Sequence, residues 1–333
     1  MTTRALGLAP LLVLALACSR TVPDTQWPPP GPSDGLPTIP AKEDDEDDSE
    51  PASGDDATDQ PAPVDGSLPR TPGVSLEREA SCSAKLCRLD GWLPDPAFAR
   101  SVPTDARGPA AIWLHRIAGG SSVTLPRHGG LHLFVVNLDG RLALRADDEN
   151  TPRELDAWHG AHVPGCGATL VASEDASVLV ALTSEAASLG AAIAKTPKEV
   201  RWQQRAAPLA TFDFAALESH TWGGGAFHAR IAVGGDSPPR AASFETLLAS
   251  PAASIAEHDH PTWEHIAILD GEGTMKLGDT DHPVRPGAVF HIPIGLRHAF
   301  SSARSRPLLA VQLYTPSGPE QRFVKLAAAE PAR

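Results

Sequence analysis

From about residue 100 onward, the chain consists of short apolar runs separated by glycine, proline and aspartate turns. Typical runs are "AIWLHRIA", "LHLFVVNLDG" and "PLLAVQLYT". Many short runs of this kind, each bounded by turn residues, predict an all-β sandwich or barrel. Helical pattern is limited to three stretches, "DFAALESH", "SFETLLAS" and "EAASLGAAIAKT". We therefore expect an all-β fold for this part of the chain.

Two short repeats indicate that the β region is duplicated. The tripeptide "LDG" at 138–140 returns at 269–271, 131 residues later, and "HGA" at 159–161 has a counterpart "PGA" at 286–288, 127 residues later. Similar offsets are typical of tandem copies of one structural unit. We expect one barrel in residues 81–200 and a second in residues 201–333.

The first 17 residues, "MTTRALGLAPLLVLALA", place one arginine before an apolar run that is too short to span a bilayer. This pattern predicts a signal peptide and export. The next residues complete "LALACS", which resembles the lipobox of bacterial lipoproteins, so Cys18 is expected to be acylated and Ser19 resembles a signal for the outer membrane. Ala15 stands where those proteins prefer leucine. The alternative is plain secretion after an ordinary cleavage site.

Residues 18–80 predict a disordered tether. They hold 12 of the 33 prolines, and 15 acidic side chains against 4 basic ones. Such a segment cannot bury enough apolar surface to offset its ordering entropy. A spacer that holds the barrels away from the membrane is the simpler interpretation, and calcium capture by "EDDEDDSE" is an alternative. The remaining residues 81–333 carry 23 basic and 26 acidic side chains, which argues against nucleic-acid binding.

Three further cysteines follow the tether. Cys82 and Cys87 are five residues apart, and an exported protein favours a disulfide between them, with two unpaired thiols as the alternative. Closing so small a loop would contribute only about 2 kcal/mol. Cys166 is interpreted as a small buried residue, because no sequence feature pairs it with an activating histidine.

A metal site is predicted by "HDHPTWEHIAILDG" at 258–271. Side chains two apart on a strand share a face, so His258 and His260 point the same way, and Glu264 begins the next strand after Pro261. A further histidine, His298, comes from "GAVFHIPIGLRHAFSS". Three imidazoles and one carboxylate favour a divalent transition metal.

These two stretches resemble the two motifs of the cupin superfamily. The matching positions are His258, His260, Glu264 and Gly271 in the first motif, and Gly287, Pro293, Gly295 and His298 in the second. Ser302 stands where asparagine is usual, and the glycine that normally precedes the first motif is absent. The resemblance implies two jelly-roll barrels and one bound metal in the second, with iron, manganese, zinc, copper and nickel left open.

Other residues are assigned with less specificity. Trp263 and Phe290 are candidates for a substrate pocket, although an aromatic core role is the competing interpretation. The tail "LYTPSGPEQRF" also resembles that of many single-metal cupins, so Gln312 and Tyr314 are expected to face the barrel interior. By contrast His265, His282 and His291 match no motif position and are interpreted as surface or packing residues.

The first repeat lacks the ligands. Aligning Gly140 with Gly271 places Arg127, Gly129 and Leu133 where the second barrel has its first three ligands, and none of them is a usual metal ligand. His128 and His132 remain nearby but would need a shifted register. The second motif is also two residues shorter and has no histidine at its end. The first barrel is therefore expected to be a degenerate cupin, like the inactive half of some bicupins.

The resemblance to metal-dependent cupins implies an oxidoreductase, such as a dioxygenase, or a decarboxylase-like lyase or isomerase, acting on a small oxygen-rich molecule. No separate carboxylate stands out as a general base. The alternative is a non-catalytic lipoprotein that binds a metal or small molecule for sensing or capture. The expected partners are a small-molecule ligand or substrate and, through the lipid anchor only, a membrane, and a homo-oligomer is compatible with the sequence.

Overall fold

The computed structural model describes residues 61–69, 100–101, 109–125, 131–147, 149–165, 167–184, 209–234 and 242–330. All of them lie in one compact unit that extends from Thr58 to Arg333. The predicted signal peptide, Cys18, Cys82, Cys87, Cys166, Arg127, His128 and Gly129 lie outside the described residues. None of the helices in the described part is long and apolar enough to cross a membrane.

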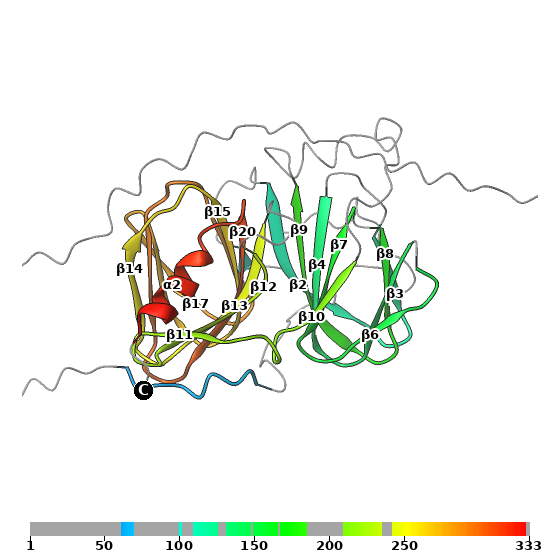
Figure 1. Ribbon diagram of the computed structural model, residues 1–333, viewed down its shortest axis with the longest axis horizontal. Coiled ribbons are helices and arrows are strands. Elements are labelled where there is room, and N and C mark those ends of the chain that lie inside the picture. The colour runs from blue at the N-terminus through cyan, green and yellow to red at the C-terminus, as the bar shows by residue number, and fades with distance from the viewer. Residues whose placement is uncertain are drawn as a thin grey trace, which may run out of the picture. The chain divides into compact units, whose positions relative to one another are not determined.

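The fold is nearly all-β and contains two tandem jelly-roll barrels, each made of a larger and a smaller sheet (Figure 1). The larger sheet of the first barrel has the order β10-β7-β4-β9-β2 and the smaller one β3-β8-β5-β6. These strands are β2 (Ala110–Ile117), β3 (Ser122–Leu125), β4 (Leu131–Asp139), β5 (Leu142–Ala146), β6 (Arg153–Leu155), β7 (His159–Pro164), β8 (Ala168–Ala172), β9 (Ala176–Ser184) and β10 (Ala210–Asp213).

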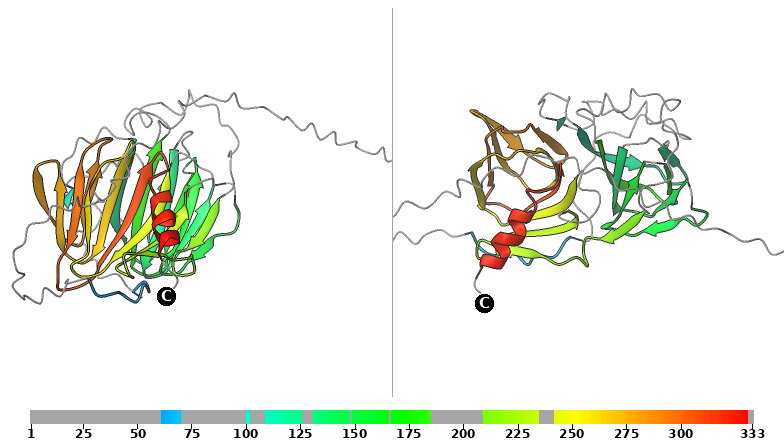
Figure 2. Two further views of the ribbon diagram at one scale, coloured as in Figure 1. Left: turned by 60° about the vertical axis from the view of Figure 1, so that its left-hand side comes forward. Right: turned by 45° about the horizontal axis from the view of Figure 1, so that its top comes forward.

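The second barrel has a larger sheet of order β1-β18-β15-β20-β13-β12-β11 and a smaller one of order β14-β19-β16-β17. Its strands are β1 (Arg100–Ser101), β11 (His220–Trp222), β12 (Phe227–Val233), β13 (Ser243–Ala249), β14 (Ser254–His258), β15 (Trp263–Asp270), β16 (Gly273–Leu277), β17 (Thr280–Val284), β18 (Ala288–Ile292), β19 (His298–Ser302) and β20 (Leu308–Thr315). The helix α2 (Gln321–Ala329) packs beside β11 (Figure 2).

The barrels exchange strands at their boundary. The strand β10 lies beyond residue 200 but pairs with β7 of the first barrel, from Ala210↔His162 to Asp213↔His159. The short strand β1 lies before residue 200 but pairs in parallel with β18 of the second barrel. A simple division at residue 200 is therefore wrong for these two strands, because each one completes the edge of the other half's sheet.

Three apolar clusters explain why the central strands are buried on both faces. One cluster fills the first barrel, a second fills the second barrel, and a third joins outward-facing residues of both larger sheets, such as Phe134 and Phe244. Their rings stack with centroids 5.1 Å apart. A strand covered on both faces needs a near-continuous apolar run rather than alternation. That is the pattern of β9, "ASVLVALTS".

The repeated "LDG" forms the same turn in both barrels. Gly140 and Gly271 both have a positive φ, +78° and +89°, which glycine adopts without strain. A Cβ atom on Gly271 would lie 2.5 Å from the carbonyl oxygen of Pro307. The turn therefore requires glycine for its backbone conformation and for space.

The expected pairing of "HGA" at 159–161 with "PGA" at 286–288 is two residues out of place in the structure. The amide of Gly287 donates to the carbonyl of Ile268, and the matching bond in the first barrel runs from Trp158 to Asn137. Trp158 also has a positive φ of 68°. Trp158, rather than Gly160, is therefore the structural counterpart of Gly287, and "HGA" and "PGA" coincide only in sequence.

The short helical predictions were wrong where the structure tests them. The stretch "SFETLLAS" at 243–250 forms β13, and "DFAALESH" at 213–220 forms a turn between β10 and β11. All seven residues of β13 are buried, because one face packs inside the barrel and the other between the barrels. Such a strand has no alternation to distinguish it from a helix. The third stretch lies outside the described residues.

Residues 61–69 belong to the predicted tether but contact both barrels. The amide of Val64 donates to Gly225 at 3.2 Å, and its carbonyl lies 3.1 Å from Nε2 of His228. Further along, the indole of Trp158 donates to Pro69 at 2.6 Å. The tether prediction is therefore wrong for these nine residues. It was based on their low apolar content, but backbone hydrogen bonds to the barrels do not require apolar side chains.

Candidate metal centre

The four predicted ligands come from three adjacent pieces of the second barrel. His258 ends β14 and pairs directly with His298, the first residue of β19. His260 lies in the loop beyond β14, where its carbonyl accepts a bond from the amide of Gly295. Glu264 is the second residue of β15 and faces the barrel interior. His260 is thus held by a loop contact and not by continuation of the strand.

The three histidines converge. Each offers one ring nitrogen, and these atoms all lie within 4.8 Å of one another. The ring centroids are 4.2 Å apart for His258 and His298, and 5.0 Å apart for His260 and His298. This is the one group of three or more metal-ligating side chains found among the described residues.

Backbone carbonyls orient all three rings in the same way. The Nδ1 atom of His258 lies 3.0 Å from the carbonyl oxygen of Ala256. The corresponding distances are 2.9 Å from His260 to Thr262 and 2.8 Å from His298 to Leu296. A carbonyl can only accept, so each Nδ1 carries the proton and each Nε2 keeps its lone pair in the neutral ring.

Glu264 adds a carboxylate to the cluster. Its Oε2 atom lies 3.0 Å from Nε2 of His260 and 3.1 Å from Nε2 of His298. Burial alone would raise the pKa of Glu264, but the contacts with the two histidines outweigh it and lower the pKa below its usual value. Burial likewise opposes a charge on His298, yet the carboxylate raises the pKa of that ring. Glu264 is therefore an anion at neutral pH.

This donor set fits a divalent transition metal. The Nε2 atom of His298 is buried and makes no well-oriented hydrogen bond within the described residues, although a carboxylate oxygen is near. A buried lone pair without a donor is costly unless something binds it. Three imidazole nitrogens and one carboxylate oxygen are ligands that iron, manganese, nickel, copper and zinc accept.

Of the predicted pocket residues, three face the interior. Gln312 and Tyr314 are buried there, and the Tyr314 ring lies 5.4 Å from that of His260. Burial, with the neighbouring Glu264, raises the pKa of Tyr314 well above its usual range. Phe290 is fully buried in the apolar core. Trp263 instead shares the opposite face of β15 with His265, with ring centroids 6.3 Å apart, so it does not line the interior.

The other histidines are packing residues, as expected. His265 and His291 are opposite each other on β15 and β18, on the faces directed at the first barrel, with their Nδ1 atoms 3.1 Å apart. Burial lowers the pKa of His291 to about 4. His282 is half-buried on β17.

In the first barrel, apolar residues occupy the equivalent positions. The strand registers equate Leu133 with Glu264 and Ala168 with His298. Both residues are completely buried in the apolar cluster that fills this barrel. His132 instead faces outward and lies 3.1 Å from His162. The two described counterparts of the ligands therefore cannot bind a metal.

One polar residue of the second barrel was missed by the sequence reasoning. Glu245 lies in β13, is completely buried, and faces the interior opposite Gln312 of β20. The stretch "SFETLLAS" also fits a helix, and a helical interpretation hides the inward direction of Glu245. The signal that could have revealed it is a single acidic residue inside the apolar run "SFETLLA".

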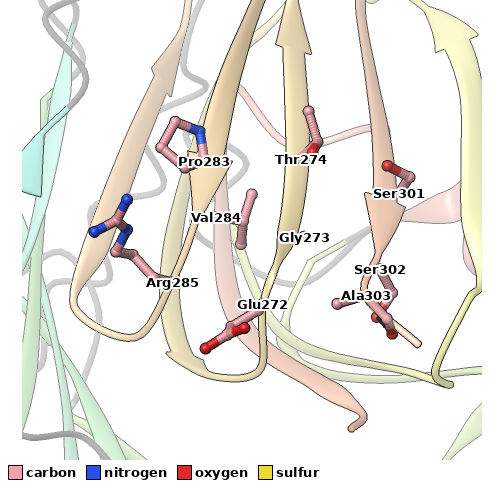
Figure 3. Close-up of a pocket in the computed structure, with 9 residues that line it drawn as sticks. All are labelled: Glu272, Gly273, Thr274, Pro283, Val284, Arg285, Ser301, Ser302 and Ala303. Atoms are coloured by element: carbon pink, nitrogen blue, oxygen red, sulfur yellow. Dashed lines mark hydrogen bonds between the residues drawn. The ribbon is translucent and has the colours of Figure 1, made fainter. Parts of the chain in front are cut away.

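A separate open cavity of about 470 Å³ lies on the smaller sheet of the second barrel, beside β16, β17 and β19 (Figure 3). It is lined by Glu272, Gly273, Thr274, Pro283, Val284, Arg285, Ser301, Ser302 and Ala303. Gly273 pairs with Ser302, whereas Leu277 pairs with His298 at the opposite end of the same strand. Four residues of strand separate the two ends by roughly 13 Å. The cavity is therefore not part of the metal centre.

One protein-family model matches part of the second barrel. Residues 247–314 match the family described as the Cupin domain. A search of curated proteins found no match to the sequence. Among solved structures, YlbA from E. coli is similar at 13% identity and a TM-score of 0.48, with 62% of this chain and 77% of that chain covered.

Oxalate decarboxylase from Bacillus subtilis is similar at 15% identity and a TM-score of 0.49, with 64% and 69% covered. AerE from Microcystis aeruginosa is similar at 12% identity and a TM-score of 0.46, with 62% and 88% covered. The matched Cupin domain runs from within β13 almost to the end of β20 and so forms most of the second barrel.

Proposed function

We propose that this protein is a metal-dependent cupin whose second barrel uses His258, His260, Glu264 and His298 to hold one divalent transition metal. The observation that carries this proposal is the shared orientation of the three histidines. Each Nδ1 faces a backbone carbonyl, so that each Nε2 is the ring atom left for a metal, and two of these Nε2 atoms lie against Oε2 of Glu264. Packing alone gives no reason for three imidazoles to present lone pairs to one point.

The metal would supply a Lewis acid or, if redox-active, a centre for electron transfer. The chain's own residues set the conditions around it. Glu264 stays anionic and offsets part of the metal's charge, and the apolar side chains of the barrel, Phe290 among them, exclude water from one side. His258 is partly exposed, which leaves a route from solvent to the centre.

We further propose that the protein acts on a small oxygen-rich molecule as an oxidoreductase or lyase. Four protein ligands on an octahedral ion leave two positions, which suits a bidentate carboxylate or enediol, or a substrate together with O₂. A non-catalytic binding protein is the competing function.

The test starts with metal analysis of the purified full chain by mass spectrometry. Oxygen uptake and CO₂ release are then measured with oxalate, flavonols, diketones and aldoses, using His298→Ala as the metal-free control. Turnover by wild type alone supports the enzyme, whereas ligand-induced thermal stabilisation without turnover supports the binding protein. Absence of a bound metal after reconstitution with each candidate ion would contradict the metal-dependent function and leave only a small-molecule binding protein.

We also propose that the protein is an exported lipoprotein, anchored through Cys18. Labelling cells with a fatty-acid analogue should mark the wild type and leave Cys18→Ser unmarked. An unmarked wild type that is nevertheless found outside the cytoplasm would support plain secretion. Light scattering on the purified full chain would distinguish a homo-oligomer from a monomer.

A further inference from the structure

Glu245 is a buried carboxyl group with no well-oriented hydrogen-bond donor among the described residues, although the Ser243 hydroxyl is near. It is 0% exposed, and neither carboxyl oxygen makes a hydrogen bond within the described residues. A carboxylate in that position would have lost its hydration with little compensation. A carboxyl group so placed takes up a proton instead.

Two other buried carboxyl groups lie near enough to Glu245 to act on its pKa, and both have donors of their own. Glu320 accepts from the amide of Gly318 at 2.5 Å. Glu264 accepts from Gln312 at 3.0 Å and lies against two imidazoles. Burial first, and then Glu320 and Glu264, raise the pKa of Glu245 well above its usual value, while Ser243 opposes this weakly. Glu245 therefore retains a proton.

Gln312 lies directly opposite Glu245, and its side-chain oxygen lacks a hydrogen-bond donor among the described residues. The two residues are cross-strand partners of β13 and β20 on the interior face, so their Cβ atoms are about 5 Å apart. The Nε2 atom of Gln312 donates to Oε1 of Glu264. This fixes the direction of the amide, because a carboxylate can only accept. The Oε1 atom of Gln312 is then a buried acceptor that has no donor among the described residues.

We propose that Glu245 is a positioning residue, held as a carboxylic acid, whose O–H donates to Oε1 of Gln312. Glu245, Gln312 and Glu264 then form one hydrogen-bonded line that ends at the candidate metal centre. In this arrangement the buried Oε1 of Gln312 gains a donor and the O–H of Glu245 gains an acceptor. It also occupies Oε1 of Glu264, which leaves Oε2, the oxygen nearest the histidines, as the coordinating atom.

This inference rests on the proposed function only where it concerns metal affinity. The protonated state and the bond to Gln312 belong to the chain without metal, and they can be measured separately. Removing a hydrogen-bonded residue behind a metal ligand commonly lowers metal affinity about 10- to 100-fold.

Infrared difference spectroscopy on metal-free protein at neutral pH tests the protonated state. Wild type should show the carbonyl stretch of a carboxylic acid, and Glu245→Gln should lack it. In Gln312→Leu the same band should move to higher frequency, because the O–H has lost its acceptor. A purely structural role for Glu245 would not move that band. Loss of an ionised carboxylate band in Glu245→Gln, or an unshifted acid band in Gln312→Leu, would overturn the proposal.

Metal titration of folded variants tests the consequence. Glu245→Gln retains an N–H donor and should bind metal within about threefold of wild type, whereas Glu245→Met, similar in size but without a donor, should bind about 10- to 100-fold more weakly. Equal affinity in both variants would overturn the positioning role. If Glu245→Met does not fold, the infrared bands decide. If wild type binds no metal but the acid band behaves as described, the proposed function fails and the hydrogen-bonded line stands.

Discussion

Leu133 occupies in the first barrel the strand position that Glu264 occupies in the second. Both residues are inward-facing, and each pairs with the equivalent neighbour, Val163 for Leu133 and Ile292 for Glu264. One barrel thus has an isobutyl group where the other has a carboxylate. The two barrels share a fold, while their interiors differ in chemistry.

We predict one tightly held metal ion per chain. After reconstitution with excess metal and desalting, His260→Ala should be empty, because binding free energies on the order of 10 kcal/mol depend on the full ligand set. His132→Ala, in the first barrel, should still retain one ion. Two ions in wild type, with one surviving in His260→Ala, would show that the first barrel also binds metal.

Metal should be lost in acid. Coordination requires neutral imidazoles, and the carboxylate of Glu264 raises the pKa of His298 above its usual 6.5. Protons therefore begin to compete with the metal near neutral pH, and occupancy should fall as the pH drops through roughly 6 to 5. Dialysis at stepped pH values followed by metal analysis measures this. Full retention at pH 4 would contradict a three-histidine site.

The pair formed by His265 and His291 should make folding stability depend on pH. The pKa of His291 is about 4 in the folded chain against 6.5 in the unfolded one, so between these values only the unfolded chain takes up the proton. The contribution of His291 to the free energy of unfolding is fully present above pH 6.5, and it falls by about 3 kcal/mol as the pH approaches 4. In urea unfolding, the free energy of unfolding of His291→Leu should depend less steeply on pH than that of wild type. The pH dependence of His282→Leu should match wild type.

Gly271→Ala should destabilise the fold more than Gly287→Ala. Both glycines have a positive φ, so an alanine costs about 1–2 kcal/mol at either position. A Cβ atom at Gly287 meets nothing within 4 Å, whereas one at Gly271 meets the carbonyl of Pro307. The clash should add about 1–3 kcal/mol. Equal losses in chemical unfolding would show that the Pro307 loop moves aside freely.

The contacts of residues 61–69 predict different effects for two deletions. Removing residues 19–57 should leave the Tm within a few degrees, since that deletion spares these contacts. Removing residues 19–69 should lower the Tm by roughly 2–4 °C for each kcal/mol lost with the bonds to Trp158 and His228. Identical Tm values in differential scanning calorimetry would mean that the segment contributes no net stability.

The sequence alone determined the all-β class and the ligand motif, for local reasons. Turn residues at short intervals limit strand length, and His258, His260 and Glu264 lie within seven residues. The tertiary structure decided features that depend on residues far apart. The exchange of β1 and β10, the orientation of the imidazoles by carbonyls and the two-residue shift at Trp158 all depend on strand pairing.

Glu245 shows the same division most clearly. In sequence it is one acidic residue in an apolar run that reads equally well as a helix. Only the pairing of β13 with β20 places it beside Gln312, and only the closed barrel removes it from water. Local pattern can specify which residues are apolar and where the chain turns. Which polar groups share a buried space depends on which distant strands become neighbours, and that is a property of the folded barrel.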